Sequence, residues 1–93
     1  MRSVKQETAF KKDLKREMGG RYRGVIEEEL PEIVEKLAKD IPLPIKYKDH
    51  ALSGKWIHHR DCHLRADLVL IYLKTDDNKL FLVRLGSHSE IFS

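Results

Sequence analysis

The chain has 93 residues, of which 41% are hydrophobic and 35% are charged, and its net charge is +3 at neutral pH. This length predicts one small domain over residues 1–93, and the N-terminus lacks the apolar core of a signal peptide. No apolar run approaches the roughly 18 residues of a membrane span, and Cys62 has no cysteine to pair with, so we expect a cytoplasmic protein with no membrane partner.

The first half of the chain is predicted to be helical. Residues 1–6 are a candidate first strand. Apolar residues then recur at every fourth position over residues 7–18, which indicates an amphipathic helix that Gly19–Gly20 ends. A second helical pattern covers residues 25–37, where Pro31 marks either the start of the helix or a kink in it.

Charge is unevenly distributed over this half. Residues 2–23 are mostly basic, and residues 27–35 are acidic. The two helices can present complementary solvated faces, or the basic first helix can follow a phosphate backbone. Both interpretations stay open at this point.

After Tyr47 the apolar period changes to two, which is typical of strands. Strands are predicted at residues 55–63, 66–74 and 79–86. The second of these strands is apolar on both faces, so we place it in the centre of the sheet. The sequence therefore predicts an α+β fold, in which an N-terminal strand and a two-helix hairpin pack on a twisted antiparallel sheet.

The hairpins are expected to bring titratable side chains together. With residues 64–66 as the loop, His63 faces Asp67 across the first hairpin. The next hairpin places Asp67 opposite either Gly86 or His88, depending on the centre of its turn. His63, Asp67 and His88 should therefore meet at one end of the sheet.

Other polar residues can join this group. Asp61 lies on the same face as His63, two residues earlier. His50 stands in the preceding loop, and its place is left open. Arg84 and Arg60 are candidate cations for binding a phosphate.

Imidazoles around a carboxylate suit three interpretations. Acid–base catalysis, such as RNA cleavage through the neighbouring 2′-hydroxyl, needs a base, an acid and a cation for the phosphate. A metal site of the His/His/carboxylate type uses the same donors, but no HxH or HExxH spacing occurs within one element. The third interpretation is that these histidines are solvated side chains at strand ends.

Six segments between Ile41 and Phe92 resemble the YafQ-type toxins of the RelE/ParE superfamily. The segments are Pro42–Leu43–Pro44, Tyr47–Lys48–Asp49–His50, Leu52–Ser53–Gly54–Lys55–Trp56, Arg60–Asp61–Cys62–His63, Asp67–Leu68–Val69–Leu70–Ile71–Tyr72 and Arg84–Leu85–Gly86–Ser87–His88–Ser89–Glu90–Ile91–Phe92. The helical first half matches these toxins only in length and amphipathic character.

The resemblance implies a microbial RNase-type fold in a type II toxin–antitoxin module. It implies cleavage of mRNA in the ribosomal A site to a 2′,3′-cyclic phosphate and a free 5′-hydroxyl, and we expect this chemistry to need no metal or other cofactor. The implied partners are RNA, the ribosome and a cognate antitoxin of the ribbon–helix–helix type. The family's functional positions carry onto His50, His63, Asp67 and His88, with Asp61 and Phe92 in support.

Roles follow from this set. We expect His50 or Asp67 to be the general base on the 2′-hydroxyl and His88 to be the general acid. His63 would hydrogen-bond Asp67 or a phosphate oxygen. Arg84 matches a strand arginine that would stabilise the developing charge.

Two alternatives accompany this interpretation. The family pattern has an aromatic residue where this chain has His59, so base stacking there is open, because histidine also stacks. A ParE-like toxin that binds a protein target such as gyrase is a different class of function. That class needs no catalytic set, so the histidines and carboxylates argue against it.

Overall fold

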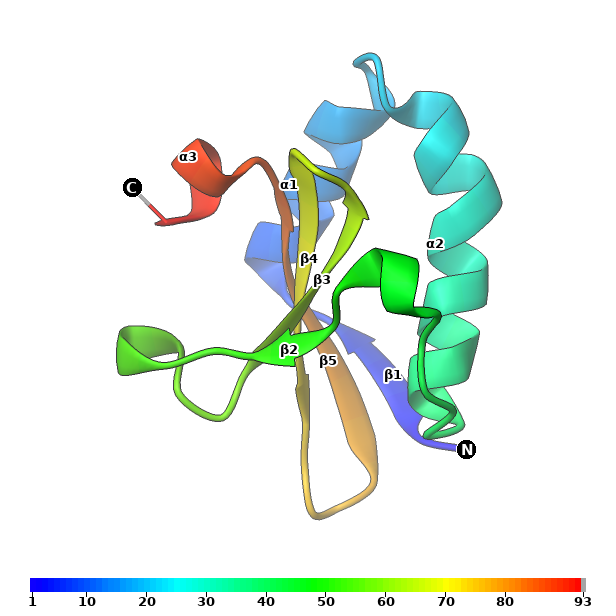
Figure 1. Ribbon diagram of the computed structural model, residues 1–93, viewed down its shortest axis with the longest axis vertical. Helices are drawn as coiled ribbons and strands as arrows, with labels where there is room; N and C mark the ends of the chain where they lie inside the picture. Colours follow the sequence, from blue (N-terminus) through cyan, green and yellow to red (C-terminus); the bar gives the residue numbers. More distant parts are fainter. Residues whose placement is uncertain (93) are drawn as a thin grey trace.

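The computed structural model describes residues 1–92, in which five strands form one sheet in the order β1-β5-β4-β3-β2 (Figure 1). The elements in chain order are β1 (Ser3–Gln6), α1 (Thr8–Met18), α2 (Arg23–Ala38), η1 (Ile45–Tyr47), β2 (His50–Ala51), η2 (Gly54–Trp56), β3 (Arg60–Arg65), β4 (Leu68–Lys74), β5 (Lys79–Gly86) and α3 (His88–Phe92). β1 runs parallel to β5, and every other neighbouring pair is antiparallel. The predicted α+β architecture is confirmed.

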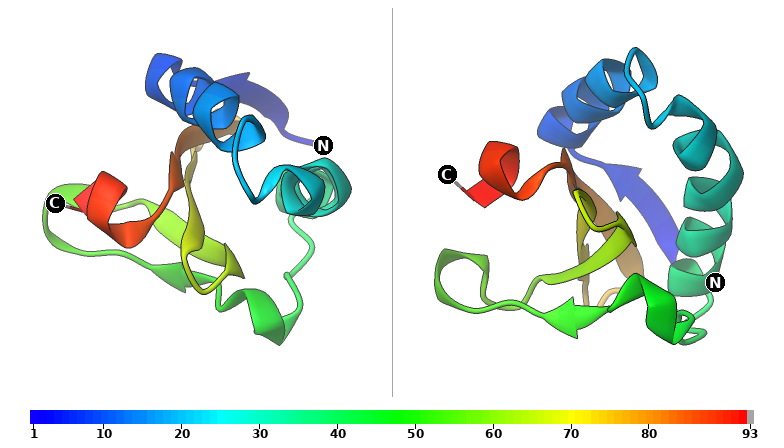
Figure 2. Two further views of the ribbon diagram at one scale, coloured as in Figure 1. Left: turned by 90° about the horizontal axis from the view of Figure 1, so that it is seen from above. Right: turned by 45° about the horizontal axis from the view of Figure 1, so that its top comes forward.

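The helices α1 and α2 lie on one face of the sheet, and η2 and α3 lie on the other (Figure 2). The main core forms where Phe10, Ile33 and Leu37 pack against the sheet residues Leu70 and Tyr72. Burial of an apolar side chain of this size contributes about 1.5–3 kcal/mol. This face of the sheet therefore supplies most of the stability.

The outer face of the sheet has a smaller apolar cluster. Val69 and Ile71 of β4 are fully buried there against Ile91, with Trp56 and Phe92 packed at the margin. Because alternate residues of β4 enter the two clusters, the prediction that this strand is central is confirmed.

One helix, α2, runs through Pro31 from Arg23 to Ala38. A proline in a helix interior costs about 3 kcal/mol, since it removes a hydrogen bond and crowds the preceding turn. Burial of Ile26 and Ile33 on either side offsets this cost. No helix within residues 1–92 has the length and apolar character needed to cross a membrane.

The strand boundaries differ from the prediction at the first two strands. The strand predicted from residue 55 begins at Arg60, because Gly54–Trp56 forms a 3-10 turn in which Gly54 has φ of 65°. The strand predicted from residue 66 begins at Leu68. The third strand, β5, has the predicted bounds.

The predicted pairing of His63 with Asp67 is wrong. His63 pairs with Val69, and a bulge then brings Arg65 opposite Leu68. The turn consists of Ala66 and Asp67, so Asp67 lies at the tip of the hairpin and not within its ladder.

Candidate active site

Three imidazoles meet at the end of the sheet beside α3. The ring of His63, on β3, lies 5.9 Å from the ring of His50 and 5.3 Å from the ring of His88, measured between centroids. His50 comes from β2 and His88 from the first residue of α3. Of the predicted meeting of His63, Asp67 and His88, the approach of His63 to His88 is confirmed, and the structure adds His50 to this pair.

A bulge in β5 contributes to this meeting. Tyr72 pairs with Leu82, whereas Ile71 pairs with Arg84, so Val83 is the extra residue. Beyond the bulge Val69 pairs with Gly86. Of the two registers predicted for this hairpin, this is the one that carries His88 toward the first hairpin. The ladder ends at Gly86, so no strand pair joins His88 to Asp67.

Asp61 is the carboxylate at the centre of the histidines. The register of β2 and β3 places His50 directly opposite Asp61, and strand alternation puts His63 on the same face. Oδ1 of Asp61 lies 3.1 Å from Nδ1 of His50 and 3.7 Å from Nε2 of His63. Asp61 is only 2% exposed. Burial raises its pKa above the ordinary value, although the neighbouring imidazoles oppose the shift.

The geometry at His50 assigns its tautomer. Nδ1 lies 2.8 Å from the backbone carbonyl oxygen of Lys48 in hydrogen-bonding geometry. Because a carbonyl only accepts, Nδ1 carries the hydrogen, and the lone pair of the neutral ring lies on Nε2. His50 can therefore accept a proton at Nε2, as a general base does.

Burial favours the neutral form of His63. Burial lowers its pKa below the ordinary value, and the nearby rings of His88 and His50 lower it further. Asp61 favours the protonated ring but does not outweigh burial. A neutral imidazole here can donate a hydrogen bond from one nitrogen and accept one at the other.

The orientation of His88 depends on a capping box. The hydroxyl of Ser87 accepts a hydrogen bond from the backbone N–H of Glu90 at 3.2 Å, and the carboxylate of Glu90 accepts from the backbone N–H of Ser87 at 3.0 Å. Hydrogen bonds donated to this carboxylate by the backbone N–H and by the hydroxyl of Ser87 lower the pKa of Glu90. Arg16 of α1 lies 3.1 Å from the same carboxylate. The first turn of α3 is therefore fixed on two sides.

Aromatic rings continue beyond His88. Phe92 lies 5.6 Å from His88, and Trp56 lies 6.2 Å from Phe92 with its ring nearly perpendicular. On the far side of this group, the ring centroid of His59 lies 5.3 Å from that of Trp56. Phe92 is thus packed against the site and is half-buried.

The predicted substrate-binding arginines are engaged with carboxylates. Nε and Nη2 of Arg84 lie 2.6 Å and 3.2 Å from the two oxygens of Asp13, a buried residue of α1. Nε of Arg60 lies 3.2 Å from Asp49. Asp67, exposed at its turn, has Arg21 at 3.9 Å.

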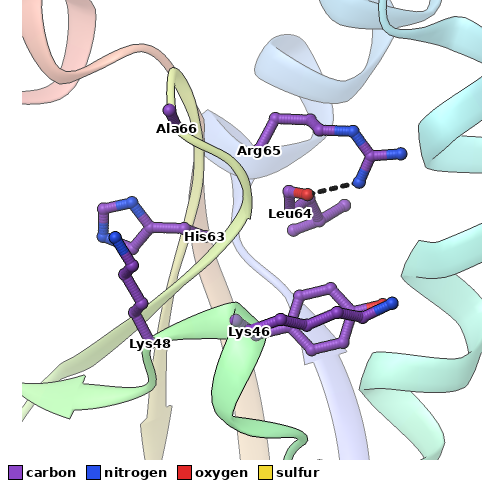
Figure 3. Close-up of a pocket in the computed structure, with 7 residues that line it drawn as sticks. Lys46, Lys48, His63, Leu64, Arg65 and Ala66 are labelled. Carbon is purple, nitrogen blue, oxygen red and sulfur yellow. Dashed lines mark hydrogen bonds between the residues drawn. The ribbon is translucent and has the colours of Figure 1, made fainter.

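A basic pocket that the sequence did not reveal adjoins His63. Its volume is about 300 Å³, and its walls come from η1 and from the β3–β4 hairpin (Figure 3). The lining residues are Lys46, Tyr47, Lys48, His63, Leu64, Arg65 and Ala66. The only sequence signal was the position of Lys48 two residues before His50.

The site also has a donor set that suits a metal. One ligand atom from each of His50, Asp61 and His63 can be chosen so that all lie within 4.8 Å of one another. Two imidazole nitrogens and a carboxylate oxygen suit Zn²⁺ or Cu²⁺. Cys62, on the same strand, is buried, and burial raises the pKa of its thiol, so it is not available as a thiolate.

Comparison with known proteins gives one consistent family. A family model described as the bacterial toxin YafQ of type II toxin–antitoxin systems matches residues 2–93. An Escherichia coli K12 protein named mRNA interferase toxin YafQ is 46% identical over 52 residues, which are 56% of this chain and 55% of that protein. A Haemophilus influenzae protein that also carries the name YafQ is 46% identical over 57 residues, which are 58% of this chain and 56% of that protein. The chain thus spans a little over half the length of the curated relatives it matches.

Solved structures are similar over the whole chain. A chain of the E. coli DinJ–YafQ complex is 32% identical, with a TM-score of 0.83 and coverage of 100% of both chains. A metal-bound toxin from Helicobacter pylori is 42% identical, with a TM-score of 0.81, covering 99% of this chain and 100% of that one.

Proposed function

Because this chain belongs to the YafQ family of bacterial type II toxin–antitoxin toxins, we propose that it is an endoribonuclease that cuts mRNA in the ribosomal A site. The observation that carries the proposal is the meeting of three imidazoles around the buried carboxylate of Asp61. The name of the E. coli relative, mRNA interferase toxin, supports the same activity.

The proposed reaction uses the 2′-hydroxyl of the RNA as nucleophile. Nε2 of His50 takes the proton of that hydroxyl, the 2′-oxygen attacks phosphorus, and the bond from phosphorus to the 5′-oxygen breaks. His88 donates a proton to the leaving 5′-oxygen. The products are a 2′,3′-cyclic phosphate and a free 5′-hydroxyl, and each proton transfer is worth on the order of 10²–10⁴ in rate.

The neighbouring groups assist these transfers. Asp61, 3.1 Å from Nδ1 of His50, stabilises the imidazolium that forms when His50 takes the proton. Neutral His63 donates a hydrogen bond to a phosphate oxygen. Asp67 remains a second candidate for the general base, and Phe92 a candidate surface for a base to stack on.

We propose that the reaction needs no metal. In the proposed mechanism His50 and His63 act through their ring nitrogens, and these two residues are also the ones that could hold a metal together with Asp61. A metal held by His50, Asp61 and His63 would then inhibit. The metal-bound Helicobacter pylori toxin shows only that a related chain can take up a metal.

We also propose a cognate antitoxin as the physiological partner, in line with the E. coli DinJ–YafQ complex. An antitoxin with a ribbon–helix–helix segment and an acidic or amphipathic helix would cover the basic surface around the site. A short reading frame of that type beside the gene would support this pairing.

The function is tested by inducing wild type and a His88→Ala variant in cells that carry a reporter mRNA and mapping its 5′ ends. We expect cuts within codons for the wild type and none for the variant, which should remain folded because His88 lies at the surface. If expression of the wild type leaves the mRNA intact and inhibits gyrase instead, the nuclease function is rejected.

A further inference from the structure

Within residues 1–92, no free arginine near the histidines supplies the cation that the reaction needs at the phosphate. Arg84 is paired with Asp13, and Arg60 is paired with Asp49. Arg65, which lines the pocket beside His63, donates from both terminal nitrogens to Glu29 at 3.1 Å and 2.7 Å.

Lys48 is differently placed. It lines the same pocket as His63, and Figure 3 shows its side chain extending toward the imidazole of His63. Within residues 1–92, no carboxylate oxygen lies within 4.0 Å of its ammonium group. Lys46 lines the pocket too, but its ammonium lies over the ring of Tyr47, 5.1 Å from the centroid.

The backbone at Lys48 is in the left-handed region, with φ of 50° and ψ of 44°. Glycine and asparagine adopt this conformation more readily than lysine does. The conformation serves the site in two ways. The carbonyl of Lys48 accepts the hydrogen bond from His50, and its side chain reaches toward His63.

We propose that Lys48 is a catalytic residue, the cation that binds the scissile phosphate. This inference rests on the proposed nuclease function. The ammonium donates to a non-bridging oxygen of the phosphodiester that lies over His63, and the basic pocket receives the RNA strand beside it. Attack by the 2′-oxygen adds negative charge to the non-bridging oxygens, so the contact strengthens in the transition state and mainly raises kcat.

The left-handed backbone permits a sharp test with a Lys48→Gly variant. Glycine removes the ammonium and fits the backbone without strain, so the variant should unfold at or above the wild-type temperature. We expect its kcat on a translated mRNA to fall on the order of 10²-fold. A Lys48→Arg variant should recover most of this loss because it restores a positive charge.

Lys5→Ala is the matched control, since it removes the same charge from exposed β1 on the opposite edge of the sheet and should cut at the wild-type rate. The binding step is followed separately by NMR of the His63 ring during titration with a short RNA whose scissile 2′-hydroxyl is replaced by hydrogen. We expect weaker binding to Lys48→Gly and a shallower dependence on salt, by about 0.7 in the log–log slope.

The outcomes separate the two proposals. An inactive wild type would reject the nuclease function itself. An active wild type together with a Lys48→Gly variant of equal kcat, or a loss that Lys48→Arg does not reverse, would overturn the role of Lys48.

Discussion

Arg84 holds its guanidinium on the carboxylate of Asp13, with Nε 2.6 Å from Oδ2. The same carboxylate accepts the backbone N–H of Leu85 at 3.0 Å, and Arg16 donates to the carbonyl oxygen of Leu85 at 3.1 Å. β1 pairs with β5 only as far as Leu82. Beyond that point, the side chains of Asp13 and Arg16 form the hydrogen bonds to the edge of β5. Helix α1 thereby fixes the end of the strand that leads to His88.

Asp13→Ala should lower the free energy of unfolding by about 2–4 kcal/mol, because it leaves the guanidinium of Arg84 and the N–H of Leu85 without their acceptor. Urea unfolding at pH 7 measures this change. Asp76→Ala removes the same charge from an exposed turn and should change stability by less than about 0.5 kcal/mol. Equal losses in the two variants would contradict the role given to Asp13.

The carboxylate of Asp13 should also make the stability of the protein sensitive to acid. Burial alone would raise the pKa of Asp13, but hydrogen bonds from Arg84, Leu85 and Arg16 hold it below the ordinary value. Its stabilisation is therefore complete above the unfolded pKa of about 4 and is lost as pH falls through the lower folded pKa. In urea melts taken from pH 5 downward, the wild type should lose this stability, and an Asp13→Asn variant should lack that part of the loss.

Asp61→Asn should stabilise the protein and slow its cleavage of RNA. Burial raises the pKa of Asp61, so the wild type loses stability as pH rises through that pKa, and the uncharged amide avoids the loss. At pH 7 we expect a melting temperature at or above that of wild type, with kcat reduced on the order of 10²-fold because the imidazolium of His50 loses its carboxylate. The stability difference should shrink at low pH, and a variant less stable than wild type at pH 7 would refute this account.

His63 makes a separate contribution to the pH dependence of stability. Its pKa is lowered in the folded state, chiefly by burial, so its contribution is present above the unfolded pKa of about 6.5 and is lost as pH falls through the folded pKa. Urea melts at pH 8 and pH 5 should show a decline for the wild type that is smaller for His63→Gln. Titration of the ring by NMR gives the pKa directly, and an unshifted value would exclude this explanation.

Metal should inhibit and chelation should not. Zn²⁺ or Cu²⁺ bound by His50, Asp61 and His63 would hold the three side chains that the proposed reaction uses. We expect the rate of cleavage to fall in proportion to the amount of metal bound, which calorimetry measures. A chelator that spares the Mg²⁺ of the ribosome should leave the rate unchanged. Loss of cleavage on chelation, with recovery on adding Zn²⁺, would instead establish a metal-dependent nuclease.

Local patterns in the sequence were enough to predict the central features of this fold. The doubly apolar run in β4 identified the central strand, because no other environment buries both faces of a strand. The approach of His63 to His88 was predicted from the two hairpins, although the first pairing used, that of His63 with Asp67, is wrong. These features depend on periodicity, which a single sequence displays.

The features that were missed depend on irregular geometry or on distant contacts. The bulge before Arg65 moved Asp67 into a turn, and one inserted residue changes every later pairing in a ladder. Asp13 lies 71 residues from Arg84 along the chain, and nothing in its helical neighbours indicates that it is buried. Lysine does not favour a left-handed backbone, so nothing in the sequence indicated this conformation at Lys48.

The contact of Asp13 and Arg16 with Leu85 bears on how the molecule behaves at high concentration. A sheet edge with free N–H and carbonyl groups is a template for a strand of another molecule, and such edges lead to aggregation. Here a carboxylate and a guanidinium satisfy both backbone groups of Leu85 at the point where β1 ends. The side chains that orient the strand leading to His88 therefore also keep that edge from recruiting a foreign strand.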